Sequence, residues 1–303
     1  MARGHERAVL AAFLLGATLA GGNAVGIRFS NRELDPLWGA GIRFSLAALV
    51  LLAVMAAMRL AVPSGRALTG TLLFGLLQFG AGFALAYYAL VELHAGFGQI
   101  LLALVPLITL LLVVVQRQER LRGAAVAGTL LALAGIVVMS RAPLREALPA
   151  LSLLAAIGSA ACMAQAAIVV RRFPPVNPVT MNAIGMATGA VVLVAGSLIA
   201  GEELVLPARG ETWTAISYLV LAGSLAVFLL YLYVLRFWPA SRATYAFVLI
   251  PFVTVLLSSR LDDEPVGPGL VVGGLLVIAG VYVGALRRAE PAAATEAGAS
   301  RSP

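Results

Sequence analysis

The segment 95–121, AGFGQILLALVPLITLLLVVVQRQERL, has a counterpart 145 residues later in the segment 240–266, ASRATYAFVLIPFVTVLLSSRLDDEPV. The two segments align without a gap and place Pro106 on Pro251 and Glu119 on Glu264. The same shift aligns further pairs, namely Phe83 with Phe228, Tyr88 with Tyr233, Thr109 with Thr254, Gly128 with Gly273, and Gly135 with Gly280. One structural unit is therefore present twice.

The composition places both units in a membrane. Of 303 residues, 61% are hydrophobic and only 12% are charged, whereas about 25% of the residues of a soluble globular protein are charged. Apolar stretches of about 20 residues recur along the chain, and the polar gaps between them are too short to fold as separate domains. The net charge is +7, but the arginines lie in the gaps and form no recognition face, so nucleic acid is not an expected partner.

We predict an all-α integral membrane protein with ten transmembrane helices. The predicted spans are 8–28, 36–58, 68–91, 95–115, 123–140, 150–170, 178–200, 213–235, 240–258 and 267–286. Residues 8–140 form the first five-helix repeat and residues 150–286 the second. Because each repeat crosses the membrane an odd number of times, the second repeat is inverted relative to the first. The remaining segments are a cytoplasmic N-terminus, 1–7, and a disordered cytoplasmic tail, 287–303.

The distribution of arginine sets the orientation. With a cytoplasmic N-terminus, fourteen arginines lie in inside segments and six in outside loops, which is the bias that cytoplasmic loops show. Both termini are then cytoplasmic, in a multi-pass protein of the cell (inner) membrane. The first apolar run could also be a cleaved signal peptide. Keeping it as a span preserves the even number of crossings and the pairing of the two halves.

The paired prolines predict where a solute pathway runs. Pro106 and Pro251 lie about eleven residues into their spans, near the membrane midplane, where proline kinks a helix and exposes backbone carbonyls. Such backbone survives only against protein or a water-lined cavity, although prolines also cause ordinary helix curvature. Polar residues accompany each proline on one face: Gln99 and Thr109 with Pro106, and Thr244 and Thr254 with Pro251. The threonines could equally bond their own helix backbone.

Further polar residues within the spans are candidates for the same pathway. They are Asn23 and its repeat partner Gln165, Gln78, Tyr88 and Tyr233. For each of these, hydrogen bonding between helices is an equally good explanation. Arg43 is the one cation well inside a span, where it either binds a carboxylate or phosphate or snorkels to the outer interface.

Several chemistries lack the residues that they need. No Asp or Glu lies near the middle of a span, the deepest being Glu92, which disfavours exchange of protons for cationic drugs. The two histidines have no metal-ligand spacing, and Cys162 has no partner for a disulfide, so neither a metal nor another cofactor is expected. The chain has no lysine and no phosphate-binding GxxxxGK[ST] motif. Energy would come from an ion gradient, with the proton as one candidate coupling ion, or from the gradient of the substrate.

From 8 to 288 the chain resembles the drug/metabolite transporter superfamily, in particular its ten-helix EamA-like family. The resemblance rests on Arg43-Phe44, on the two proline segments quoted above, and on the paired glycines. It implies a central cavity that opens alternately to each side and carries small metabolites, often amino acids or related compounds. Where the family often has Trp-Gly-x-Asn, this chain has Gly21-Gly22-Asn23, which removes an aromatic side chain from the expected cavity.

We therefore expect a secondary active transporter, and an exporter, of small metabolites. It should work as a monomer or homodimer among membrane lipids. The alternative is a non-transporting membrane scaffold or lipid-handling protein. A membrane enzyme is the least favoured, because no acid, base or metal groups converge at one depth.

Overall fold

The computed structural model describes residues 2–117, 123–141, 149–237 and 246–283. Within these ranges all regular structure is helical. The elements are α1 (Ala2–Asn31), α2 (Pro36–Ala57), α3 (Gly65–Gly75), the π-helix η1 (Leu76–Gly82), α4 (Phe83–Glu92), α5 (Ala95–Leu102), α6 (Val105–Val115), α7 (Gly123–Arg141), α8 (Ala150–Arg172), α9 (Pro178–Ala200), α10 (Gly210–Val220), the π-helix η2 (Leu221–Ala226), α11 (Val227–Phe237), α13 (Ala246–Leu261) and α14 (Pro268–Val281).

Six helical stretches in the described part of the chain are long and apolar enough to cross a membrane. They are Glu6–Asn31, Pro36–Ala57, Gly65–Glu92, Ala95–Val115, Ala150–Arg172 and Pro178–Ala200. Shorter apolar helices are Val126–Val138, Leu249–Leu261 and Pro268–Val281. Proline stands in the first turn of α2, α9 and α14, where its missing N–H has no helical partner to lose and its fixed φ angle favours helix initiation.

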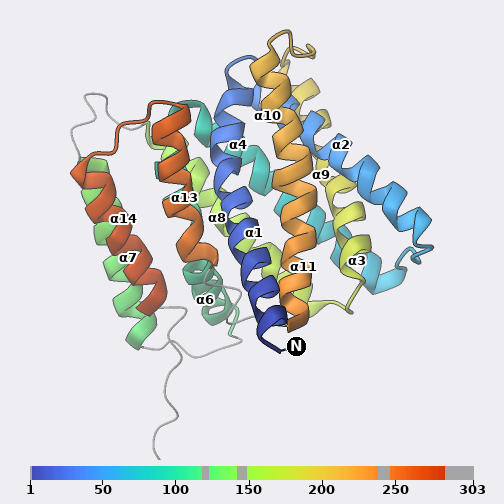
Figure 1. Ribbon diagram of the computed structural model, residues 1–303, viewed down its shortest axis with the longest axis horizontal. Coiled ribbons are helices and arrows are strands. Elements are labelled where there is room, and N and C mark those ends of the chain that lie inside the picture. Colours follow the sequence, from blue (N-terminus) through green and yellow to red (C-terminus); the bar gives the residue numbers. More distant parts are fainter. Residues whose placement is uncertain (1, 118–122, 142–148, 238–245, 284–303) are drawn as a thin grey trace, which may run out of the picture.

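The helices form one bundle with α1 running through its middle (Figure 1). On one side α7 packs along α14, and on the other α2 packs along α9. At one end of the bundle, which we call the Asn31 end, α1 stops and α2, α5, α8, α10 and α14 begin. The opposite, N-terminal end carries the start of α1 and the ends of α6 and α8.

Glycines bring α7 and α14 into backbone contact. A Cβ atom added to Gly135 would lie 2.6 Å from the carbonyl oxygen of Gly273, and one added to Gly280 would lie 2.5 Å from that of Gly128. Only glycine permits an approach this close. Of these glycines, Gly128, the earlier one of α7, meets Gly280, the later one of α14, and Gly135 meets Gly273. The two helices are therefore antiparallel.

Two departures from regular α-helix occur at equivalent places in the two halves. The π-helices η1 and η2 begin at Leu76 and Leu221, and these residues are 145 positions apart in the sequence. A π-helix has a wider turn that displaces backbone carbonyls from the regular hydrogen-bond ladder and often marks a functional site. The sequence pattern gave no sign of either one, because their polar residues, Gln78 and Ser224, do not distinguish a π-helix from an α-helix.

The two prolines act differently. The predicted span 95–115 is divided into α5 and α6, and the interruption at Ala103 and Leu104 comes directly before Val105-Pro106. By contrast, α13 continues through Pro251. Proline removes a single hydrogen bond, which a helix packed among neighbours tolerates without ending.

Candidate functional site

Arg43 is buried in the middle of the protein. It lies on α2 with only 1% of its surface exposed. A side chain that snorkels would extend along an apolar surface and place its guanidinium in water. The guanidinium of Arg43 instead points inward, so in this structure the snorkelling alternative does not apply.

Three protein groups hold one side of the guanidinium. Its Nε donates to the Ser224 hydroxyl at 3.2 Å, and Nη2 donates to the side-chain oxygen of Asn23 at 3.2 Å and to the carbonyl oxygen of Gly223 at 3.4 Å. The Asn23 amide also donates to the Gly223 carbonyl, at 3.4 Å. We call Asn23, Arg43, Gly223 and Ser224 the central polar cluster. It joins α1 and α2 to η2, and its carbonyl acceptor comes from the π-helix.

Aromatic rings surround the cluster. The Cζ atom of Arg43 lies 4.9 Å from the ring centre of Phe44 and 5.0 Å from that of Phe83, within the range of cation–π attraction. The charge of Arg43 also acts electrostatically on the hydroxyl groups of Tyr87 and Tyr218. Tyr218 donates its hydroxyl to the carbonyl oxygen of Leu19 at 2.7 Å, which ties α10 to α1.

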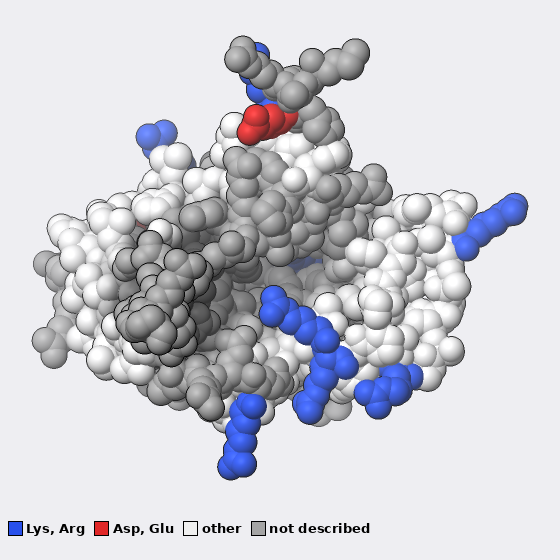
Figure 2. Space-filling view, turned by 90° about the horizontal axis from the view of Figure 1, so that it is seen from below, with Lys and Arg blue, Asp and Glu red and all other residues white. Residues whose placement is uncertain are grey.

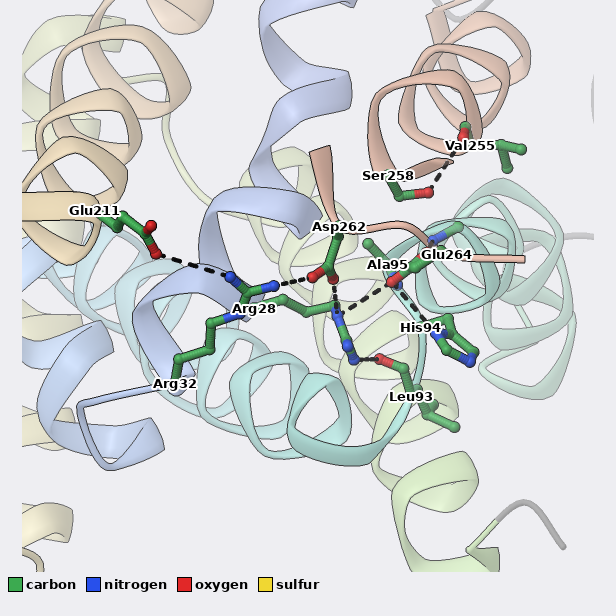
Figure 3. Close-up of polar contacts among 11 residues, drawn as sticks. Arg28, Arg32, Leu93, His94, Ala95, Glu211, Val255, Ser258, Asp262 and Glu264 are labelled. Atoms are coloured by element: carbon green, nitrogen blue, oxygen red, sulfur yellow. Dashed lines mark hydrogen bonds and ion pairs between the residues drawn. The ribbon is translucent and has the colours of Figure 1, made fainter. Parts of the chain in front are cut away.

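A second group of charged residues closes the Asn31 end. Figure 3 shows Arg28, at the end of α1, meeting Asp262 and Glu264, which follow α13, and Arg32, just after α1, meeting Asp262. Arg28 Nε lies 2.6 Å from the Asp262 carboxylate and 3.1 Å from that of Glu264, and Arg32 pairs with Asp262. We call these four residues, together with His94 and Glu211, the end network. It joins α1, the α4–α5 turn, α10 and α13.

Glu264 also caps the first turn of α5. Its carboxylate accepts hydrogen bonds from the amides of Ala95, at 2.5 Å, and Gly96, at 3.2 Å (Figure 3). Burial alone would favour the neutral acid, but the contact with His94, the hydrogen bonds from these two amides and the nearby Ser258 hydroxyl outweigh it and lower the pKa of Glu264. The carboxylate is therefore ionised at neutral pH and holds α13 against α5.

Other acids cap helices at the same end. Glu202 accepts from the amides of Leu37 and Trp38, at 3.1 and 2.8 Å, in the first turn of α2. Glu33 accepts from the amides of Ala208 and Arg209 just before α10. Negative groups are favoured at helix N-termini, where backbone N–H groups lack partners. These contacts tie segments distant in the sequence to one another at the Asn31 end.

The N-terminal end differs in shape and charge. Seen from this end, the surface is hollowed near its centre and positive side chains lie around the hollow (Figure 2). Exposed arginines in or just after the helices that end or begin here are Arg7, Arg59, Arg66, Arg117, Arg171 and Arg172. Among the described acidic residues only Glu6 lies at this end. The molecule is thus closed by ion pairs at one end and hollowed at the other.

The structure brings two of the sequence candidates, Asn23 and Arg43, into one site. Thr254 links helices, because its hydroxyl donates to the Gly21 carbonyl at 2.7 Å, whereas Thr109 bonds the Val105 carbonyl of its own helix. Gln165 accepts a hydrogen bond from Gln116 at 2.8 Å. The other candidates are placed as follows: Gln78, Gln99 and Tyr233 half-buried, Tyr88 exposed, and Thr244 outside the described residues.

Sequence reasoning missed Ser224, Tyr87 and Tyr218. The repeat comparison selects residues that both halves share, such as Tyr88, which aligns with Tyr233. Tyr87, which is fully buried, aligns with Leu232 and has no such signal. One available signal was its spacing of four from Phe83, which places both rings on one helix face.

The comparisons with known proteins agree with this architecture. The EamA-like transporter family matches residues 7–141 and again residues 150–285. The chain belongs to this family. The EamA-like family match covers each half separately, as expected for a duplicated unit.

Known relatives of this EamA-like chain include bacterial and archaeal proteins. It is 31% identical over 245 residues to the uncharacterized inner membrane transporter YedA of Escherichia coli, with 78% of each chain covered. It is 26% identical over 266 residues to an uncharacterized transporter of Archaeoglobus fulgidus, with 85% of this chain and 91% of the relative covered. A solved crystal structure matches 92% of this chain and 97% of its own with a TM-score of 0.62 and 20% identity, which shows a shared fold.

These findings identify the EamA-like chain as a multi-pass transporter of the inner membrane. Its family implies a small-molecule substrate.

Proposed function

We propose that the protein is a secondary active transporter that exports small metabolites, such as amino acids or related compounds, by alternating access between two inverted five-helix repeats. The observation that carries the proposal is the position of the central polar cluster. It lies buried between a closed Asn31 end and a hollowed N-terminal end. This is the arrangement of a solute site that is sealed from one side of the membrane.

The packing of α7 on α14 supports the inverted arrangement. Gly128 and Gly135 of the first repeat correspond to Gly273 and Gly280 of the second. If each glycine is replaced by its counterpart in the other repeat, the contact of Gly135 with Gly273 becomes the contact of Gly280 with Gly128. The structure contains both contacts, and their distances from the added Cβ to the carbonyl oxygen are nearly equal. Reciprocal contacts of this kind arise when a two-fold axis relates two units. Because the two helices are antiparallel, that axis lies in the membrane plane.

We assign the Asn31 end to the outside and the N-terminal end to the cytoplasm. The exposed arginines of the N-terminal end support this orientation. The end network is then an outer gate, and solute enters from the cytoplasm through the hollow. Export follows when the network opens and the repeats rock about the central polar cluster. A proton is one candidate for the coupling ion.

Flux into liposomes tests the proposal. Purified protein is reconstituted, and exchange of labelled amino acids, organic acids and amines across the membrane is compared with that of protein-free liposomes. We expect saturable exchange of at least one class, and its reduction when Asn23→Ala removes one of the two side-chain acceptors of Arg43. Exposed Arg171→Gln is the matched control. No exchange above protein-free liposomes for any class would contradict the proposal.

A further inference from the structure

The guanidinium of Arg43 is only half satisfied. Nε and Nη2 have protein acceptors, but Nη1 is buried and has no hydrogen-bond partner among the described residues. A buried donor without an acceptor is destabilising, and a charged one more so. Packing of the helices alone does not explain why a charged donor is buried without an acceptor at Arg43 Nη1.

A second unsatisfied group lies beside it. The Tyr87 hydroxyl lies near enough to Arg43 for a weak side-chain hydrogen bond and for an electrostatic interaction, but the contact lacks good hydrogen-bond geometry, and this buried oxygen has no well-formed partner in the described part of the chain. Two polar groups from different helices, α2 and α4, are therefore adjacent and both lack an acceptor. An oxyanion with two oxygen atoms would satisfy both.

The charge of Arg43 is uncompensated as well. The ion pairs found among the described residues involve Arg28, Arg32 and His94, all in the end network. The partners of Arg43 are a hydroxyl, an amide oxygen and a backbone carbonyl, none of which carries a negative charge. A buried cation of this kind gains most from an anionic ligand.

The other half of the molecule shows that the fold does not need this cation. The first two helices of the repeats align at a shift of 142 residues, which places Arg43 on Gly185. The later helices align at a shift of 145 residues, which places Phe79 on Ser224. Gly185 packs on Phe79 and Phe74, with an ideal Cβ position 3.4 Å from the Phe79 ring. The equivalent contact is thus made by a small residue and an aromatic ring without polar groups. The guanidinium is an addition confined to one repeat.

We propose that Arg43 Nη1 and the Tyr87 hydroxyl bind the carboxylate of an organic monocarboxylate with an apolar or aromatic body. This inference deepens the proposed function and rests on it for the route by which the ligand arrives. A single cation matches one negative charge, and the rings of Phe44, Phe83 and Tyr87 fit an apolar body. The central polar cluster offers no carboxylate to an ammonium group, so a zwitterion would be bound more weakly. In the present conformation Nη1 is sealed, and the ligand enters when the repeats move.

Binding to the purified native protein in detergent tests the assignment without requiring transport. The probe is labelled 3-phenylpropionate, and the competitors are phenylalanine, phenethylamine and inorganic phosphate. The first two competitors share the phenylethyl skeleton but carry a zwitterion and a cation in place of the anion. We expect unlabelled 3-phenylpropionate to compete best, phenylalanine less well, and phenethylamine and phosphate not at all. Equal or better competition by phenethylamine or phosphate would overturn the assignment.

Variants locate the site. Arg43→Gln should weaken 3-phenylpropionate binding on the order of 30-fold or more, Arg43→Lys should recover part of it, and Tyr87→Phe should weaken it less than Arg43→Gln. Arg171→Gln, an exposed arginine at the N-terminal end, should bind as the native protein does. Unchanged binding in Arg43→Gln would overturn the proposal. Because the competitor series uses native protein only, it decides the matter even if Arg43→Gln fails to fold.

The two proposals fail separately. If 3-phenylpropionate binds in an Arg43-dependent way but no solute crosses liposomes, the anion site stands and transport is wrong. If amines or sugars are exchanged and 3-phenylpropionate does not bind, transport stands and the anion site is wrong.

Discussion

Gly135 of α7 lies so close to Gly273 of α14 that a Cβ atom on Gly135 would be 2.6 Å from the Gly273 carbonyl oxygen. Gly280 has the same relationship to Gly128, at 2.5 Å. These paired contacts fix the distance between two helices that correspond to each other in the two repeats. Because the two contacts are equivalent, alanine at Gly135 and alanine at Gly280 should lower the stability of the protein by similar amounts.

We predict that Gly135→Ala and Gly280→Ala each destabilise the protein by about 1–3 kcal/mol, because the methyl group meets backbone that cannot move aside easily. The two losses should be similar, since the contacts are equivalent. Gly123→Ala, in the same α7 but with nothing within 4 Å of the added Cβ, should be neutral or slightly stabilising. Thermal unfolding in detergent measures all three, and a stable Gly135→Ala variant would contradict the close packing.

We predict that Gly223→Ala disables the central polar cluster. A Cβ atom at this position would overlap the Asn23 side chain and come within 3.4 Å of Arg43 Nη2. Solute exchange in liposomes should fall at least about tenfold, which corresponds to about 1.4 kcal/mol. Gly210→Ala, whose added Cβ has open space, is the control. Equal exchange by the two variants would show that the geometry of η2 is not needed.

We predict that the end network weakens in acid. The pKa of Glu264 is lower in the folded protein than its ordinary value of 4.5. A carboxyl group of this kind contributes its full stabilisation above the ordinary pKa and loses it as the pH falls below 4.5 through the lowered value. Thermal unfolding at a series of pH values should show this loss in the native protein and a smaller one in Glu264→Gln. Glu203→Gln, which alters an exposed acid, should keep the native profile.

Topology reporters should place both termini in the cytoplasm. We also expect opposite locations for reporters inserted after Glu119 and after Glu264, because these residues are equivalent in an inverted repeat. Reporters for cytoplasmic and external compartments, used in parallel, check each position. Detection of both insertions on one side of the membrane would contradict the inversion.

Six of the ten predicted spans correspond to helical stretches in the described part of the chain that are long and apolar enough to cross a membrane, because length and apolarity leave a strong signal in the sequence. The predicted starts at 36, 95, 123, 150 and 178 coincide with the first residues of α2, α5, α7, α8 and α9. The π-helices were not predictable, because a wider turn leaves no mark in a sequence such as the one around Leu221. Arg43 and Asn23 could be named as candidates, since polar groups are expensive in a membrane.

The end network was harder to anticipate. Glu264 was recognisable as the repeat partner of Glu119, but its role as the cap of α5 depends on how three chain segments meet. A partial signal existed in His94, which occupies the N-cap position of α5 without making a capping bond. A helix without its own cap needs an acceptor from elsewhere, and the sequence does not say from where.

The most direct test of alternating access is to lock the outer gate reversibly. An ideal Cβ at Gly96 of α5 lies 3.6 Å from the Ser258 hydroxyl oxygen of α13 and 2.9 Å from the Val255 side chain. Gly96→Cys with Ser258→Cys can therefore form a disulfide once Val255→Ala makes room and Cys162→Ala removes the native thiol. Solute exchange in liposomes is measured after oxidation and again after reduction. The account predicts that exchange is abolished by the disulfide and restored by reduction. Equal exchange in both states would contradict it.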